Sequence, residues 1–341
     1  MVHYCSYFYL SVLSLWGQNI VRLFTLTFKI FIGFVACAIV AELILSLFPV
    51  ATGFQRDTEN FPIRHWKPDS NYVYSNGWNF RNAQKGSTNN YGFSNVKDYT
   101  KNGAEILLIG DSYFEAQQVS RGNTIEDVIQ KLSNKNTYTI SVSGSALPDY
   151  IKYLEYGLKE FNPKQVVVKI FDADLVGAFT TEYPMGSYFV QTENSFILKT
   201  TEANLTNFKM KNFFKKSSLL RYCLINLKIL EQIKLAFDFT DEDESIEPDL
   251  ELLTKKLKVY LSVKFKELNL DKKSVLILTN HETLFTNLAT DGFNVLNIEK
   301  ALSKIEDNTD YSMNFAPYDY HWNFRGHFKA GQAVNRALQG M

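Results

Sequence analysis

The strongest constraint on how this chain folds is the run of large apolar residues from Ile106 to Ile109, which ends at Gly110. Such a run predicts a buried strand. Gly110 allows a sharp turn there, and Ser112 follows two residues later. A side chain just past the carboxyl end of a buried strand lies where open α/β sheets bind ligands. Spacing alone also fits a serine that only caps a helix.

From residue 105 onward, short apolar runs alternate with longer amphipathic stretches. This alternation predicts an α/β fold with a central parallel sheet wrapped by helices, within one domain over about 104–341. We expect strands at 106–109, 138–142, 166–171 and 274–278, and helices at 124–132, 149–159, 250–268, 298–305 and 325–338.

Residues 176–248 break this rhythm and are predicted to be an insertion. Within it we expect a hairpin at 187–201 and one helix at 217–237. The acidic stretch 240–249 that follows is interpreted as a solvated linker, with metal binding as the alternative.

Near the N-terminus, residues 25–50 form a strongly apolar stretch with two charged residues, Lys29 near its edge and Glu42 inside it. A helix needs about 20 apolar residues to cross a bilayer, so this stretch predicts one transmembrane anchor. A buried helix and a cleaved signal peptide are the alternatives. Residues 1–24 are predicted to form an apolar segment at the membrane interface. Basic residues flank the span on both sides, so charge alone does not orient it.

Between the anchor and the domain, residues 52–103 are polar and rich in turn formers. We expect either a linker with short strands at most, or a lip over the site in which Trp66, Trp78 and Tyr91 stack on a sugar.

Composition excludes some classes of function. The 36 basic and 36 acidic side chains balance, so no global field favours nucleic acid. Of the three cysteines, Cys5 and Cys37 lie in the apolar N-terminal region, which leaves Cys223 alone. The predicted domain therefore holds neither an internal disulfide nor a cysteine-based metal cluster. No cofactor and no metal are expected.

A second informative stretch, 317–327, contains Asp319 and His321 two residues apart. A histidine can take the proton of a serine hydroxyl while a carboxylate fixes its tautomer. Both residues are expected on a loop that leads into the last helix. Without Ser112, satisfied local hydrogen bonds would explain His321 and His327 equally well. His65 and His281 receive no role, and Glu115 is expected to face the cleft or to form a local salt bridge.

Together these residues resemble the SGNH (GDSL-like) hydrolase superfamily, in its membrane-anchored, polysaccharide-modifying branch. Gly110-Asp111-Ser112 matches the first block, Ser143-Gly144-Ser145 the second, and Asp319 with His321 the last. The resemblance covers about 105–339 and implies a three-layer α/β/α, flavodoxin-like fold. One block departs from the pattern: Ala173 stands where the family has an asparagine that donates to the oxyanion.

The resemblance implies acyl-ester chemistry. Ser112 would be the nucleophile, His321 the base and then the acid, and Asp319 the residue that orients it. The backbone N–H groups of Ser112 and Gly144 would bind the oxyanion. The implied substrate is a cell-envelope or exported polysaccharide that carries an acyl group, with acetyl as the expected one. Water as acceptor makes the enzyme an esterase, and a sugar hydroxyl makes it an acyltransferase.

The resemblance further implies an inner-membrane protein with one span and an extracytoplasmic domain. The alternative function is an SGNH-fold protein of weak or no activity that binds glycans or assists assembly, and Ala173 is the feature that favours it.

Overall fold

The computed structural model describes residues 2–55, 57, 61–95, 97–179, 186–201, 215–236, 249–305, 312–316 and 319–341 of the chain. Its centre is a five-stranded parallel sheet with the order β4-β3-β5-β8-β9. The strands are β3 (Ile106–Gly110), β4 (Thr137–Ser141), β5 (Gln165–Lys169), β8 (Val275–Thr279) and β9 (Asn294–Asn297).

The strand order is that of a flavodoxin-like sheet, in which the first strand is internal and its two neighbours come next in the chain. The order in which successive strands are added therefore reverses at β3, which makes the carboxyl end of this strand the switch point where such sheets bind ligands. The predicted α/β class and parallel sheet are confirmed. The edge strand β9 was not predicted, because its four residues carry only two large apolar side chains.

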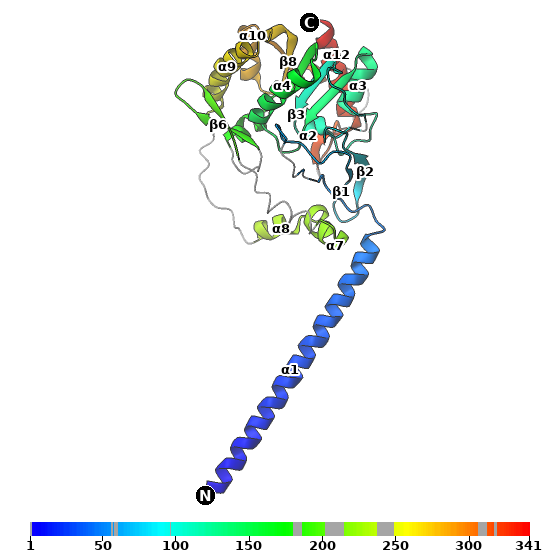
Figure 1. Cartoon of the computed structure of the whole chain (residues 1–341), viewed down its shortest axis with the longest axis vertical. Coiled ribbons are helices and arrows are strands. Elements are labelled where there is room, and N and C mark those ends of the chain that lie inside the picture. The colour runs from blue at the N-terminus through cyan, green and yellow to red at the C-terminus, as the bar shows by residue number, and fades with distance from the viewer. Residues whose placement is uncertain are drawn as a thin grey trace.

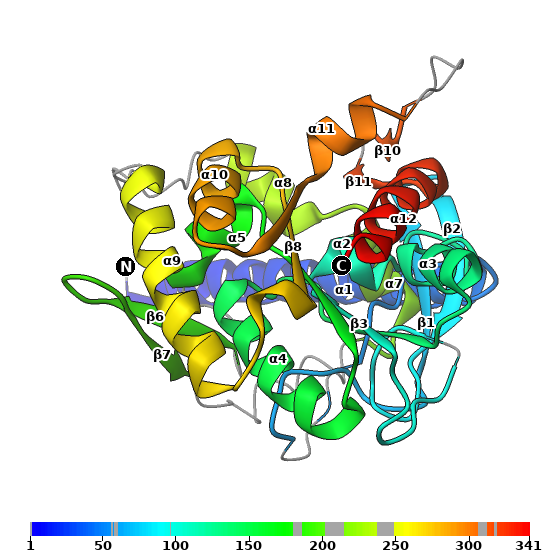
Figure 2. The same cartoon turned by 90° about the horizontal axis from the view of Figure 1, so that it is seen from above.

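Helices cover both faces of the sheet, and β3, β4, β5 and β8 are buried along almost their whole length. One face carries α4 (Leu147–Phe161), α9 (Leu250–Glu267) and α10 (Glu282–Thr290), and the other α3 (Ile125–Ser133), α11 (Ile298–Ser303) and α12 (Phe324–Gln339). In Figure 2 the strands β3 and β8 lie between α4 on one side and α12 on the other. The two cores use alternate residues of β3, with Leu107 and Ile109 in one and Ile106 and Leu108 in the other.

A single helix, α1 (Val2–Leu45), projects from the domain and ends at its base (Figure 1). The segment Phe24–Leu45 of this helix has 22 residues and is long and apolar enough to cross a membrane. None of it is buried against the rest of the protein. The helix stops five residues before the expected end of the anchor at residue 50. Beyond it the chain turns, and Val50 and Ala51 are already buried in the domain. Residues 2–24 continue the same helix instead of forming a separate segment.

The segment after α1 packs closely on the domain. It forms an antiparallel hairpin of β1 (Asn71–Asn76) and β2 (Arg81–Ser87), which agrees with the short strands expected there. Phe54, Trp66 and Phe93 are buried in the main hydrophobic core. The described part of 52–103 is therefore an integral layer of the domain and not a spacer. Trp66 is buried against Phe54, and so cannot stack on a sugar.

In the insertion, β6 (Ser187–Gln191) and β7 (Phe196–Thr200) form the expected hairpin. The single helix expected at 217–237 is wrong. The chain instead forms α7 (Ser218–Arg221), the π-helix η2 (Tyr222–Asn226) and α8 (Ile229–Ala236). The break lies at Lys228, whose φ of +50° is outside the right-handed helical region. Most of the acidic stretch, 240–248, lies outside the described residues.

Candidate active site

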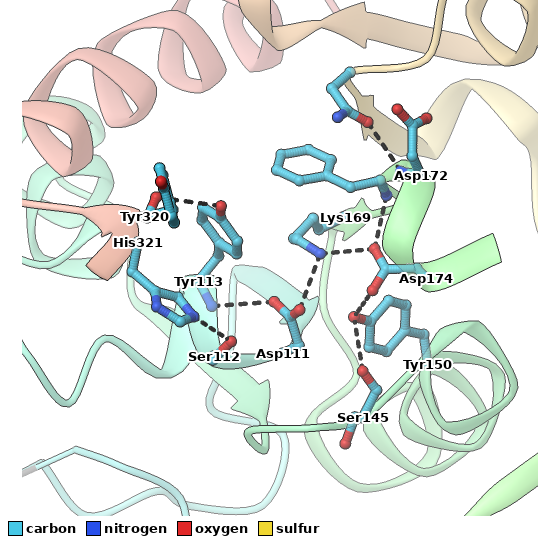
Figure 3. Close-up of polar contacts among 12 residues, drawn as sticks. Asp111, Ser112, Tyr113, Ser145, Tyr150, Lys169, Asp172, Asp174, Tyr320 and His321 are labelled. Atoms are coloured by element: carbon cyan, nitrogen blue, oxygen red, sulfur yellow. Dashed lines mark hydrogen bonds and ion pairs between the residues drawn. The ribbon is translucent and has the colours of Figure 1, made fainter. Parts of the chain in front are cut away.

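Ser112 begins the short helix α2 (Ser112–Glu115), directly after the central strand β3. Asp111 caps this helix by accepting a hydrogen bond from the N–H of Tyr113 at 3.0 Å. The Oγ of Ser112 lies 2.7 Å from the Nε2 of His321. Figure 3 shows the imidazole directed at the hydroxyl across the end of the sheet. A serine hydroxyl and an imidazole separated by 209 residues in the chain are therefore within hydrogen-bond distance.

His321 and Asp319 lie on the strand β11 (Asp319–Trp322), which pairs with β10 (Asn314–Phe315) where a loop was expected. Residues two apart on a strand point to the same side, so the strand sets their proximity. The Nδ1 of His321 is 2.5 Å from Oδ1 of Asp319. The other carboxylate oxygen accepts a hydrogen bond from the hydroxyl of Tyr74 at 2.7 Å. Both oxygens of Asp319 are thus held in place.

This arrangement shifts the pKa values of both ionisable groups. Burial lowers the pKa of His321, but its hydrogen bond to Asp319 and the negative charge of that residue outweigh burial, and the pKa is raised. Burial raises the pKa of Asp319, but hydrogen bonds from His321 and Tyr74 outweigh it and lower the pKa to about 2. At neutral pH Asp319 is therefore ionised and stabilises the protonated imidazole.

Beneath Ser112 lies a buried ion cluster that the sequence analysis missed. Lys169, at the end of β5, is 3.1 Å from Asp111 and 2.6 Å from Asp174 (Figure 3). Tyr150 also donates to Asp174, at 2.7 Å. Burial lowers the pKa of Lys169, but the two carboxylates outweigh it and raise the pKa. The cluster holds Asp111, and through it the helix that begins with Ser112. The sequence signal that could have indicated this cluster is a lysine at the end of an otherwise apolar strand.

The Ser143–Gly144 turn follows β4 and faces this same end of the sheet. Gly144 has a φ of +74°, which favours glycine. Arg64 donates to the carbonyl oxygens of Ser143 at 2.9 Å and Gly144 at 2.8 Å, and lies 3.7 Å from Asp149. A trans peptide directs its N–H opposite to its carbonyl, so the Gly144 N–H points away from Arg64.

Glu115 also supports this turn. Its carboxylate accepts hydrogen bonds from the hydroxyl of Ser143 and from the indole N–H of Trp66. The side chain is buried, and burial raises its pKa against those hydrogen bonds. The expectation that Glu115 faces the cleft or forms a local salt bridge is therefore wrong. It links α2, the second block and the 52–103 segment.

A cavity of about 500 Å³ opens beside the imidazole. Its walls come from β1, from α2 and the residues after it, from β11, and from the insertion, and they include Tyr74, Tyr113, Gln117, Ile225, Lys228 and His321. Gln117 brings a side-chain amide to the cavity that sequence reasoning had not singled out. A second cavity, of about 510 Å³, lies against α12 and includes none of the three residues Ser112, His321 and Asp319.

The structure also places the other residues singled out in the sequence. Ala173 is exposed in α5 (Asp172–Val176). His281 caps α10 by accepting from the N–H of Leu284. The buried His65 contacts the carbonyl of Tyr91. The ring of His327 accepts a hydrogen bond from the N–H of Ile125 and so joins α12 to α3.

Within the described residues, no group of three or more His, Cys, Asp or Glu side chains is arranged to hold a metal ion. The groups that meet at the site are the hydroxyl of Ser112, the imidazole of His321 and the carboxylate of Asp319. This set suits proton transfer coupled to nucleophilic attack.

No family model and no curated protein matches the chain. Similar solved structures include a lipase/acylhydrolase from Enterococcus faecalis, with 13% identity, 69% of this chain and 95% of that one covered, and a TM-score of 0.36. An acetyl xylan esterase, Est2A, from the rumen bacterium Butyrivibrio proteoclasticus has 12% identity, 76% and 68% coverage, and a TM-score of 0.32.

A carbohydrate esterase family 2 enzyme with a carbohydrate binding domain, from Corynascus thermopiles (Myceliophthora fergusii), has 10% identity, 75% and 70% coverage, and a TM-score of 0.31. These TM-scores are too low for the likeness to bear on function, which is argued below from the geometry of the site.

Proposed function

We propose that this chain is a membrane-anchored serine esterase of SGNH type, which removes or transfers an acyl group, acetyl in the first instance, on a cell-envelope or exported polysaccharide. The observation that carries the proposal is the hydrogen-bonded series from Ser112 Oγ to His321 Nε2 and from His321 Nδ1 to Asp319. Its distances of 2.7 and 2.5 Å are those of an activated serine nucleophile.

In the first half of the reaction, the Nε2 of His321 accepts the hydroxyl proton as Ser112 Oγ attacks the ester carbonyl. The N–H groups of Ser112 and Gly144 donate to the developing oxyanion. His321 then returns the proton to the leaving sugar oxygen, and an acyl-serine remains. In the second half the imidazole deprotonates water, or a second sugar hydroxyl, which attacks the acyl-serine. The bond between the acyl carbon and Ser112 Oγ then breaks, and His321 returns the proton to Oγ. Asp319 stays ionised throughout and stabilises the imidazolium.

Two features support an active enzyme despite Ala173. The serine, the imidazole and the carboxylate are all present and in contact. The oxyanion turn is also fixed from behind by Arg64 and Glu115, neither of which an inactive descendant would need. Two backbone donors without the family's asparagine are expected to give a slower enzyme, because one oxyanion donor contributes about 10²–10³-fold in rate.

Residues 24–45 anchor the chain in the inner membrane, and the domain faces the periplasm or outer surface. The length and apolar character of α1 support the anchor. The orientation rests on the resemblance to the membrane-anchored branch, and a reporter fused at the C-terminus tests it. A cytoplasmic signal would contradict the orientation.

The direct test is turnover of p-nitrophenyl acetate by the full chain in detergent. We expect Ser112→Ala and His321→Ala each to reduce kcat by about 10³-fold or more, because each removes a member of a cooperating set. Thr286→Ala, at an exposed hydroxyl on α10, is the matched control. Equal rates for the wild type and Ser112→Ala would contradict the proposed function.

A further inference from the structure

The end of α1 is joined to the insertion by one carboxylate. Glu42 accepts hydrogen bonds from the hydroxyl of Ser217 at 2.7 Å and from the N–H groups of Ser218 and Leu219 at 2.7 and 2.8 Å. These are the donors that α7 leaves free at its start. Since Glu42 lies in the last turn of α1, α7 begins beside the end of the apolar helix. In Figure 1, α7 and α8 lie on the side of the domain from which α1 leaves.

The length of the apolar part of α1 sets where this contact lies relative to a bilayer. Its 22 residues extend about 33 Å at 1.5 Å per residue, close to the roughly 30 Å of hydrocarbon in a membrane. If Phe24 lies at one boundary, Leu45 lies at the other. Glu42 and the start of α7 are then at headgroup level.

Large apolar side chains are exposed on this side of the domain, around the point where α1 leaves. They come from the turn after α1, the tip of the β1–β2 hairpin, η2 and α8. We define this exit surface by Leu47, Phe48, Trp78, Leu224, Leu230 and Ile233, of which Leu47 is 85% and Trp78 72% exposed.

The parts of the exit surface are packed together. Phe48 stacks on Phe80 with ring centroids 5.5 Å apart, and Phe80 contacts Tyr222 at 5.4 Å. The hydroxyl of Tyr222 donates to the carbonyl of Trp78 at 2.9 Å. Aromatic rings with one polar end are typical of the membrane–water interface. The hairpin tip, η2 and the end of α1 therefore form one continuous surface.

The charge of this segment suits a lipid surface. Residues 215–236 contain five basic residues and one acidic residue, in a chain whose total charge is balanced. Basic residues beside exposed leucine and isoleucine are the composition of segments that lie on anionic membranes. A soluble face of the same domain would have no reason to combine these features around the exit of α1.

We propose that the exit surface lies on the lipid bilayer that α1 crosses, and that it holds the catalytic cavity at that surface. This inference rests on the proposed membrane anchor. The same insertion supplies Ile225 and Lys228 to the wall of the cavity that contains His321. The cavity is therefore bounded by the element that touches lipid. The substrate class that fits is an ester carried at headgroup level, on a lipid-linked glycan or a lipid-borne acyl donor.

Depth-sensitive labelling of the full chain tests the placement. In a Cys5→Ser/Cys37→Ser/Cys223→Ser background, an environment-sensitive fluorophore is attached at Leu230→Cys on the exit surface. The same label at Phe34→Cys reports the anchor, and at Val263→Cys, an exposed apolar site on α9, it provides the matched control. The chains are reconstituted in vesicles of phosphatidylcholine and phosphatidylglycerol, with nitroxide-labelled lipid or aqueous iodide as quencher.

We expect the labels at positions 34 and 230 to be quenched by lipid nitroxide and protected from iodide, and the label at 263 to behave in the opposite way. The inference is overturned if the label at 34 is quenched by lipid nitroxide but the label at 230 behaves like the label at 263. The inference is also overturned if the label at 230 is protected from both quenchers and this protection increases with the number of protein molecules per vesicle. In that case a second copy of the chain covers the surface. If lipid nitroxide does not quench the label at 34, the proposed membrane anchor itself is contradicted.

An activity comparison separates this inference from the proposed chemistry. The Leu230→Glu/Ile233→Glu variant should hydrolyse soluble p-nitrophenyl acetate at the wild-type rate. On a fluorogenic acetyl ester with a long alkyl tail, embedded in the same vesicles, it should lose about tenfold or more, because charged side chains replace apolar contacts with lipid. Val263→Glu should change neither rate. Equal loss on both substrates, or on neither, contradicts the inference, whereas an inactive wild type contradicts only the proposed function.

Discussion

At the scale of single residues, the candidate site depends on side chains that fix other side chains. Tyr74 and the backbone of His321 hold Asp319, Lys169 holds Asp111, and Arg64 holds the Ser143–Gly144 turn. Each of these partners is buried or half-buried, where a hydrogen bond to a charged group is stronger than in water. Preorganisation of this kind lowers the reorganisation needed when charge develops in the transition state.

The raised pKa of His321 leads to a pH prediction. His321 must be neutral to accept the proton of Ser112, so kcat/KM should rise as pH increases through a pKa above the ordinary value of about 6.5. Asp319→Asn removes the negative charge that raises this pKa. The variant should lose about 10⁴-fold in kcat, and its residual activity should begin to rise at lower pH. Rates of p-nitrophenyl acetate hydrolysis by both proteins across the pH range test this prediction. It is contradicted if the activity of the variant begins to rise at the same pH as that of the wild type.

Tyr74→Phe is expected to act through Asp319 alone. It removes one hydrogen bond to the carboxylate, and a bond to a charged group contributes about 1.5–3 kcal/mol, so kcat/KM should fall by about 10- to 100-fold. Tyr91→Phe is the matched control, since its hydroxyl donates to Glu160 in the domain core and away from the site. If both variants lose the same activity, the effect of Tyr74 is one of folding and not of positioning.

At the scale of elements, the position of His321 depends on how α12 is held. Asn323 caps α12 by accepting from the N–H groups of Arg325 and Gly326. The same side chain donates to the carbonyl oxygens of Ser312 and Asn314, so it joins the β10–β11 pair to the start of the helix. Further along, α12 packs closely on α3 through Gly331. His321, the proposed base, therefore lies on a strand whose following helix is fixed at two points.

Gly331→Ala should test that packing. A Cβ at this position would lie 2.6 Å from Cγ1 and 2.7 Å from Cβ of Val128, a residue too stiff to move aside cheaply. Overpacking costs about 1–3 kcal/mol and better helix propensity returns about 1 kcal/mol. We expect Tm to fall by about 2–4 °C in a thermal melt in detergent. Gly340→Ala, whose Cβ would meet only an ordinary contact at 3.6 Å, should leave Tm nearly unchanged.

At the scale of the whole molecule, buried ionisable groups link stability to pH. His327 is fully buried and its pKa is lowered to about 3, chiefly by burial. The unfolded chain binds a proton on this residue below about pH 6.5, while the folded chain does not until about pH 3. The stability that His327 contributes is therefore present above pH 6.5 and is lost as pH falls toward 3. Burial raises the pKa of Glu126 to about 7, so the folded chain binds a proton on this residue before the unfolded chain does as pH falls. Protonation of Glu126 therefore increases stability as pH falls from about 7 toward the ordinary pKa range of glutamate.

Comparison of the wild type with His327→Asn isolates the first effect. Asparagine keeps an acceptor for the N–H of Ile125 but does not titrate. The free energy of unfolding of the wild type relative to the variant should decline by about 1.4 kcal/mol per pH unit below pH 6.5. Urea titrations of both proteins at several pH values measure the difference. A difference that does not change with pH would show that His327 has the same pKa in the folded and unfolded chains, which contradicts the lowered value.

The sequence by itself determined the class of fold and the residues of the proposed chemistry. The apolar runs of β3, β4, β5 and β8 had to be buried on both faces, and four of the five sheet strands follow from that requirement. Ser112, Gly144, Asp319 and His321 could be proposed because each lies in a short local motif. The apolar part of α1 was also evident, since about 20 apolar residues have few other uses.

Only the tertiary structure decided what surrounds those residues. Tyr74 and Asp319 are 245 positions apart, and Arg64 and Gly144 are 80 apart, so no local pattern could pair them. The polar, turn-rich composition of 52–103 concealed that its few apolar side chains complete the main core. The contact of Glu42 with α7 likewise depends on how the insertion folds back on α1. Burial and long-range closure of the chain are collective properties, whereas the strand and motif signals are local.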